Sequence, residues 1–321
     1  MKMSLPDLKA GVDQQIPCNH PEEVESLIAR LKANPWPEGV EPCRKHYDAM
    51  NGKIDPQVSQ RSVIVNDVPG MMLTPRLCSD TVVLFLHGGG YVFGSSQSHG
   101  GMAAQIALRL GCRVLVLDYQ RAPEAPCPAA VEDATKAYGW LLEHRVDTEN
   151  IAIVGDSAGG GLVISTLVAL RESGQPLPAA AVCVSPWVDL SMSGESHVSR
   201  RGMDPAVDES TVNFVAGAYL GNRSPQDMQA SPVFADLAGL PPLLIQVGER
   251  EILYSDSVLL REKARAAGVE VTFEEWLGQI HVWHFYYDAL QDAHRALDRI
   301  SEFLSDRLLT PMAAVTEKQC V

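Results

Sequence analysis

Residues 155–159 read Gly-Asp-Ser-Ala-Gly and place one nucleophilic hydroxyl between small neighbours. An apolar run, residues 151–154, precedes them, and a stretch with helical periodicity, residues 162–170, follows almost at once. Gly-x-Ser-x-Gly between a strand and a helix is typical of a tight turn that exposes a serine nucleophile, and its glycines let neighbouring backbones approach. A phosphate-binding loop would carry a lysine after its glycines, and none follows here. Ser157 is therefore the candidate nucleophile.

A second glycine-rich turn, His-Gly-Gly-Gly at residues 87–90, follows the apolar run 82–86. Acyl transfer places negative charge on a carbonyl oxygen, and backbone N–H groups without side chains can approach that oxygen closely. This type of loop accompanies a serine nucleophile turn in lipases and esterases. We therefore predict an oxyanion hole from the N–H groups of Gly89, Gly90 and Ala158, with Gly88 making the turn. His87 precedes the turn and is expected to brace it.

The two glycine-rich motifs together resemble the hormone-sensitive-lipase family, including its bacterial esterase branch. Residues 118–124 and 185–190 are also similar to stretches of that family, although the first has Gln-Arg where the family usually has Arg-Leu. The similarity runs from about residue 82 to residue 281. It implies an α/β-hydrolase fold and a serine carboxylesterase that acts on short to medium acyl esters. It also implies that the chain forms a homodimer through its last strand or helix. Acyl transfer of this kind needs no metal or organic cofactor, and none is expected.

A serine hydroxyl becomes a nucleophile when a histidine takes its proton and a carboxylate orients that histidine. In this fold the chain order is serine, acid, histidine, each at the end of a strand. His281 and His284 follow the last predicted strand, whereas His197 lies in a presumed cap and His294 within the last predicted helix. In the resembling family the catalytic histidine opens such a loop before Gly or Val, which implies His281. His284 is the alternative.

The orienting acid is expected after the predicted strand 243–247, where residues 248–253 read Gly-Glu-Arg-Glu-Ile-Leu. The resembling family usually has Gly-x-x-Asp-x-Leu at this point, so the matching position is Glu251. A glutamate replaces the aspartate here, and the fold accepts either. Glu249 and Asp256 remain alternatives. The resulting hypothesis is an ester hydrolysis through an acyl-enzyme, with a triad of Ser157, His281 and Glu251.

Short β-branched runs alternate with longer helical patterns along most of the chain. Such alternation predicts an α/β fold, a mostly parallel sheet of about eight strands flanked by helices. The runs predicted as strands are 63–65, 82–86, 114–118, 151–154, 179–184, 243–247 and 271–276. The predicted helices are 21–32, 98–110, 129–144, 158–171, 208–220, 255–267 and 286–305.

Two segments interrupt this alternation and are predicted to form one composite helical cap over the carboxyl edge of the sheet. The first is the N-terminal segment 1–55, which has no clear strand, and the second is an insertion at 187–230. The catalytic core is expected to comprise residues 56–186 and 231–308, followed by a flexible tail at 309–321.

Composition narrows the classes of partner. The 321 residues include 40 acidic and 26 basic ones, a formal net charge of −14, without a basic stripe. Nucleic-acid binding needs a concentrated basic face and is not expected. We expect no signal peptide at the N-terminus, since it lacks an apolar run, and no membrane span. Seven scattered cysteines without metal-ligand spacing favour a reducing, cytoplasmic location and argue against a metal site.

The substrate is the least constrained part of the prediction. A lactone hydrolase is an alternative, because the glutamate acid and the His-Val-Trp sequence at 281–283 look like those of monoterpene epsilon-lactone hydrolases. An amide hydrolase would use the same machinery. The alternative from another class is a non-catalytic ligand receptor on the same scaffold, although such relatives tend to lose the histidine.

Overall fold

A computed structural model describes residues 13–50 and 53–309 of the chain. Residues 310–321 of the expected tail, and residues 1–12, where the prediction about a signal peptide falls, lie outside the described residues.

The centre of the structure is a nine-stranded sheet with the order β1-β9-β8-β7-β6-β4-β5-β3-β2. All neighbouring strands are parallel except that β3 is antiparallel to both β2 and β5. The bounds are β1 Gln14–Ile16, β2 Val58–Val65, β3 Val68–Pro75, β4 Val82–Leu86, β5 Arg113–Leu117, β6 Ile151–Asp156, β7 Ala180–Val184, β8 Leu243–Gly248 and β9 Val271–Trp276. The predicted α/β fold with a mostly parallel sheet is therefore confirmed.

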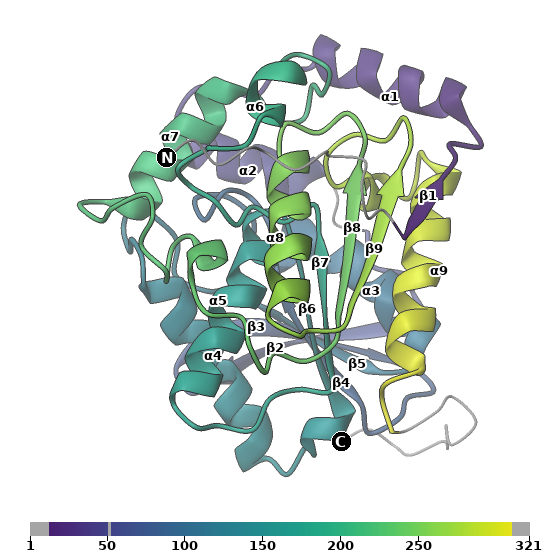
Figure 1. The fold of residues 1–321 in the computed structure, drawn as a ribbon. Helices are drawn as coiled ribbons and strands as arrows, with labels where there is room; N and C mark the ends of the chain where they lie inside the picture. The colour runs from purple at the N-terminus through teal and green to yellow at the C-terminus, as the bar shows by residue number, and fades with distance from the viewer. Residues whose placement is uncertain (1–12, 51–52, 310–321) are drawn as a thin grey trace.

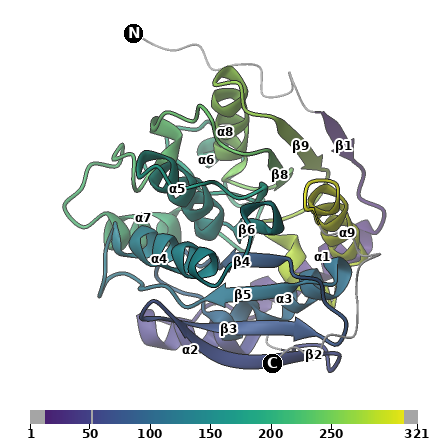
Figure 2. The ribbon, with the colours of Figure 1, turned by 90° about the horizontal axis from the view of Figure 1, so that it is seen from below.

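Helices cover both faces of the sheet, as parallel strands require (Figure 1). The bounds are α1 Pro21–Ala33, α2 Val40–Met50, α3 Ser96–Leu110, α4 Ala129–Glu143, α5 Ala158–Glu172, α6 Ser196–Ser199, α7 Glu209–Leu220, α8 Tyr254–Ala266 and α9 Gln291–Ser305. Three short 3-10 helices add η1 Thr148–Asn150, η2 Pro232–Phe234 and η3 Trp283–Tyr286. Figure 2 shows α4 and α5 on one side of the sheet and α9 on the other.

Strand β4 illustrates how the sheet divides the apolar core. Its five residues are all buried, because successive side chains point to opposite faces and both faces are covered. Leu84 and Leu86 join the cluster that includes side chains of α4, α5 and α8. Val83 and Phe85 join the cluster that includes α3 and α9. A continuous apolar run of this kind cannot reveal which neighbours it will have, but it does predict burial on both faces.

The structure corrects the prediction that residues 1–55 contribute no strand. β1 lies at one edge of the sheet and pairs in parallel with β9, with Ile16 opposite Trp276. A three-residue strand that begins with two glutamines carries almost no local signal. β3 was also not predicted, since its two prolines and one glycine are typical of turns. The last helix begins at Gln291 rather than 286, because η3 precedes it.

The helices α1 and α2 fall within the expected N-terminal cap segment, and α6 and α7 within the expected insertion. Figure 1 shows all four gathered at one end of the sheet. The insertion contacts the loops after β4 and β9, because Val215 packs against Gly90 and Asp204 bonds to His281. The insertion thus reaches loops at the carboxyl ends of the strands, the edge at which α/β sheets bind their ligands. None of the described helices combines the length and the apolar character that crossing a membrane would require.

Candidate active site

Ser157 joins β6 to α5 in a backbone conformation that side chains rarely adopt, with φ of 54° and ψ of −121°. Its N–H donates to the carbonyl of Val184 at 2.8 Å, and its own carbonyl accepts from Trp187 N–H at 2.9 Å. Ser157 is partly exposed, although the six residues before it and the eleven after it are buried. The fold thus holds a strained turn in place and brings the predicted nucleophile to the surface of the core.

The glycines of the turn have no room for a side chain. A Cβ at Gly155 would lie 2.4 Å from the carbonyl oxygen of Gly159. A Cβ at Gly159 would lie 2.0 Å from the carbonyl oxygen of Leu86, on the neighbouring strand β4. The spacing of the motif therefore reflects two backbone contacts, one within the turn and one across the sheet.

The loop after β4 lies beside this turn and is tied to it by Asp156. The Gly88 N–H donates to Asp156 Oδ1 at 3.0 Å. Gly89 and Gly90 have φ of 107° and 63°, which favours glycine at both positions. Their N–H groups donate to no acceptor in the described part of the chain, and both residues are partly exposed. Two of the predicted oxyanion donors are thus available, whereas Gly88 uses its N–H to fix the loop.

His87 packs against Tyr119 and contacts the loop that follows it, which is consistent with the predicted bracing role. Its ring stacks on Tyr119 with centroids 4.2 Å apart, and its Nδ1 lies 2.8 Å from the carbonyl oxygen of Gly88. Burial lowers the pKa of His87 to about 3, an effect that the nearby His99 strengthens. A buried ring that stays neutral packs without a counter-ion, which suits a supporting role.

The loops after β8 and β9 bring Glu251 and His281 together. His281 Nδ1 lies 2.8 Å from Glu251 Oε2. The other carboxylate oxygen, Oε1, accepts from Ser185 Oγ at 2.7 Å and from Gly248 N–H at 2.5 Å. A carboxylate only accepts hydrogen bonds, so Nδ1 carries the proton and Nε2 is left as the basic nitrogen. Glu251 is fully buried and His281 is 6% exposed.

The pKa of His281 lies above its ordinary value. Burial disfavours the positive ring, but the hydrogen bond to Glu251 and the charges of Glu251, Asp204 and Asp156 outweigh burial. A histidine whose pKa is raised by a carboxylate partner is suited to take up a proton during a reaction.

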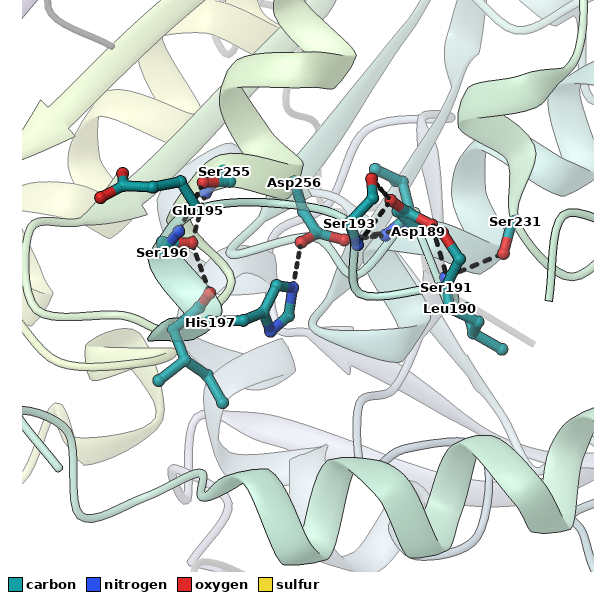
Figure 3. Close-up of polar contacts among 12 residues, drawn as sticks. Asp189, Leu190, Ser191, Ser193, Glu195, Ser196, His197, Ser231, Ser255 and Asp256 are labelled. Carbon is teal, nitrogen blue, oxygen red and sulfur yellow. Dashed lines mark hydrogen bonds and ion pairs between the residues drawn. The ribbon is translucent and has the colours of Figure 1, made fainter. Parts of the chain in front are cut away.

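The alternatives that the sequence left open have other partners. Asp256 accepts from the N–H groups of Val188 and Asp189 and lies 3.2 Å from His197 Nε2. Figure 3 shows His197 directed at this carboxylate. Glu249 Oε2 accepts from the N–H of Gly278. These two carboxylates therefore bond to other groups, and the ring of His281 bonds to Glu251.

His284 is also engaged elsewhere. Its Nε2 lies 2.7 Å from Gln246 Oε1. Burial lowers its pKa to about 3, so the ring stays neutral inside the core.

Two polar residues near His281 were not predicted. Ser185 Oγ contacts both Glu251 and the N–H of Val282. Asp204 Oδ2 accepts from the backbone N–H of His281 at 2.5 Å. The sequence marks Ser185 only as part of a stretch similar to the resembling family, and nothing in the local sequence marks Asp204. Within residues 13–50 and 53–309, no group of three or more histidines, cysteines or acids is arranged to hold a metal ion.

Comparison with known proteins identifies the family of the chain. The profile of a family described as alpha/beta hydrolase fold matches residues 83–285. The chain belongs to the alpha/beta hydrolase fold family. Within that family, an acetyl-hydrolase of Streptomyces hygroscopicus is 47% identical over 242 residues, which cover 75% of this chain and 81% of the relative. An esterase of Acinetobacter venetianus is 31% identical over 250 residues, which cover 78% of this chain and 82% of that relative.

Solved structures narrow the place of the chain among alpha/beta hydrolases. An esterase of the bacterial hormone-sensitive lipase family superimposes with a TM-score of 0.87 and 44% identity, over 89% of this chain and 98% of that one. EstE5, soaked with p-nitrophenyl butyrate, superimposes with a TM-score of 0.87 and 38% identity, over 90% of this chain and 99% of the EstE5 chain. The chain is thus a member of the bacterial hormone-sensitive lipase family, and its homologues are named esterases and acetyl-hydrolases. It falls among carboxylic-ester hydrolases.

Proposed function

We propose that the protein is a serine carboxylesterase in which Ser157, His281 and Glu251 form the catalytic triad. The observation that carries the proposal is the 2.8 Å contact between His281 Nδ1 and Glu251 Oε2, taken together with the strained and partly exposed turn at Ser157. Ser157 is tied to the strand that precedes Ser185, and Ser185 in turn bonds to Glu251. These contacts support the proposal that three loops, each from a different strand, form one reaction centre.

In the first half of the reaction, Ser157 Oγ attacks the ester carbonyl carbon while His281 Nε2 takes the hydroxyl proton. Glu251 holds the imidazolium that results. When the tetrahedral intermediate collapses, the bond to the alcohol oxygen breaks and His281 returns the proton to that oxygen. The alcohol leaves and the acyl group remains on Ser157. In the second half, water repeats the attack with His281 again as base, which releases the acid and restores the serine.

The carbonyl oxygen carries negative charge in both tetrahedral intermediates. We assign its stabilisation to the N–H groups of Gly89 and Gly90 and to that of Ala158, the first residue of α5. Two observations support this assignment: the N–H groups of the two glycines donate to no acceptor among residues 13–50 and 53–309, and the positive end of the α5 dipole lies at Ala158. Gly88 acts through the turn, since its N–H already donates to Asp156.

We propose short to medium acyl esters as substrates. Support comes from the name acetyl-hydrolase of one relative and from the p-nitrophenyl butyrate used with EstE5. A lactone or an amide would meet the same triad, and the glutamate acid beside His-Val-Trp keeps the lactone alternative open. Turnover of nitrophenyl acetate, butyrate and octanoate beside several lactones and a matched anilide separates these substrates. Preferential turnover of the lactones would reverse the assignment.

The triad is tested with Ser157→Ala, which removes the nucleophile. We expect kcat on nitrophenyl acetate to fall by on the order of 10⁶-fold, with an unchanged melting temperature. Ser165→Ala is the matched control, because Ser165 lies on the same helix and its hydroxyl donates to the carbonyl of Gln229, away from the proposed triad. Near-normal turnover by Ser157→Ala would refute the proposal. Labelling of the wild type by an organophosphonate tests the receptor alternative, since only an activated serine reacts.

The homodimer and the cytoplasmic location stay predictions. β1 occupies the outer edge of β9, so a sheet that continued through the last strand would first have to displace β1. The surface of α9 therefore becomes the expected contact. Sedimentation equilibrium at micromolar concentration is the test, and a single monomeric species would refute the dimer.

A further inference from the structure

A second carboxylate, Asp204, reaches the histidine loop from the cap insertion, between α6 and α7. Its Oδ2 accepts the backbone N–H of His281 at 2.5 Å, and its Oδ1 accepts the N–H of Ala206 at 2.8 Å. The residue is only 3% exposed. Burying a carboxylate costs free energy unless its oxygens accept hydrogen bonds. One of the two oxygens of Asp204 accepts from the backbone N–H of His281.

The segment that carries Asp204 is fixed to the loop after β8, which carries Glu251. Arg200 donates to the carbonyl of Glu249 and lies 3.5 Å above the ring of Tyr254. Ser196 exchanges hydrogen bonds with Ser255, as Figure 3 shows. The insertion therefore connects the loop of the acid to the loop of the histidine.

The charged and titratable groups around Asp204 come from three elements. His281 from the loop after β9 favours its charge, whereas Glu251 from the loop after β8 opposes it. Tyr286 of η3 also faces Asp204, and Asp156 at the end of β6 acts on His281 from the other side. Burial raises the pKa of Asp204 to about 6, so the carboxylate is mostly charged at neutral pH.

We infer that Asp204 is a positioning residue through which the cap holds the catalytic histidine. Its hydrogen bond fixes the backbone of His281, and its negative charge stabilises the imidazolium that forms when Ser157 is deprotonated. The Glu251 carboxylate bonds to the imidazole ring of His281, and the Asp204 carboxylate bonds to the backbone N–H of the same residue. This inference rests on the proposed function of His281.

The test is Asp204→Asn, which keeps the size of the side chain and removes its charge. We expect kcat for nitrophenyl acetate to fall roughly tenfold with little change in KM, the rate equivalent of one hydrogen bond to a charged group. Loss of the carboxylate also lowers the pKa of His281. Since activity is lost when His281 is protonated, the acid limb of the kcat/KM profile should move to lower pH, by about one unit.

Two variants control the comparison. Asp208→Asn changes a neighbouring carboxylate of the same insertion, which caps α7 through the N–H of Thr211, and asparagine caps equally well. We expect it to leave kcat and the pH profile unchanged. Asp204→Glu restores the charge and should return the acid limb toward the wild-type position.

An Asp204→Asn enzyme with the wild-type acid limb and kcat would overturn the inference. Failure of the proposed function would look different, since Ser157→Ala would then remain active. If Asp204→Asn does not fold, ¹³C NMR of aspartate carboxyls in the wild-type protein still decides. A midpoint near 6 for Asp204 supports its buried position on the histidine loop, and a midpoint near the ordinary value of about 4 contradicts it.

Discussion

At the scale of single residues, the turn around Ser157 makes the strictest demands on side-chain type. Ser157 has a positive φ, and the Cβ positions of Gly155 and Gly159 are occupied by carbonyl oxygens. One of these oxygens belongs to Leu86 on a different strand, so the motif also records how closely β4 and β6 approach. The strain is held because β6 and α5 are buried along almost their whole length.

We predict that Gly159→Ala lowers the free energy of unfolding by about 3 kcal/mol and abolishes esterase activity, because the new methyl group overlaps the carbonyl of Leu86. Gly139→Ala is the matched control on α4, where a Cβ would meet no atom within 4 Å. Since alanine is the better helix former, this control should gain up to about 1 kcal/mol. Urea denaturation measures both. Equal stability of the two variants would contradict the steric explanation.

At the scale of elements, α2 shows how the N-terminal segment supports the oxyanion loop. Arg44 is only 8% exposed, and its Nε donates to the carbonyl of Val92 at 2.9 Å. Nη2 donates to the carbonyl of Ala122, and the guanidinium pairs with Glu124. One planar side chain thus joins a cap helix to two loops of the core, which an ammonium group cannot reproduce.

Arg44→Lys is therefore expected to lower the free energy of unfolding by about 2 kcal/mol, since a lysine cannot satisfy both carbonyls and Glu124 at once. It should also lower kcat, because Val92 belongs to the turn that follows Gly90. The exposed neighbour Lys45 offers the control, and Lys45→Ala should stay within about 0.5 kcal/mol of the wild type. A similar stability for both variants would show that α2 docks without the guanidinium.

At the scale of the whole molecule, the cap and the core share one apolar interior. Val212, Val215 and Tyr219 of α7 belong to the same buried cluster as the strand residues of β4 and β6. The ring of Tyr219 stacks on Tyr91 of the oxyanion loop with centroids 3.7 Å apart. An insertion packed in this way is expected to unfold together with the sheet.

We therefore predict that urea unfolds the protein in one transition. The loss of esterase activity and the change in tryptophan fluorescence should have the same urea midpoint. Val215→Ala should shift both midpoints together, because it removes buried apolar volume shared by cap and core. An activity loss at clearly lower urea than the fluorescence change would show that the cap unfolds separately.

The sequence alone determined the features that arise from neighbouring residues. The turn at Ser157, the glycine loop and the buried central strands follow from local steric and burial patterns, and these patterns also predicted the α/β fold. Three elements could not be predicted from the sequence: the short edge strand β1, the proline-containing strand β3 and the helix α2. Their stability comes from distant partners and not from their own residue pattern.

Only the tertiary structure decided which polar groups meet. Glu251, Glu249 and Asp256 were all candidates by position, and the packing of separate loops placed Glu251 on His281 and Asp256 on His197. The contact of Asp204 with His281 spans 77 positions, so no spacing rule could have found it. Hydrogen bonds between side chains act over about 3 Å, and which loops come that close is set by the order of the strands.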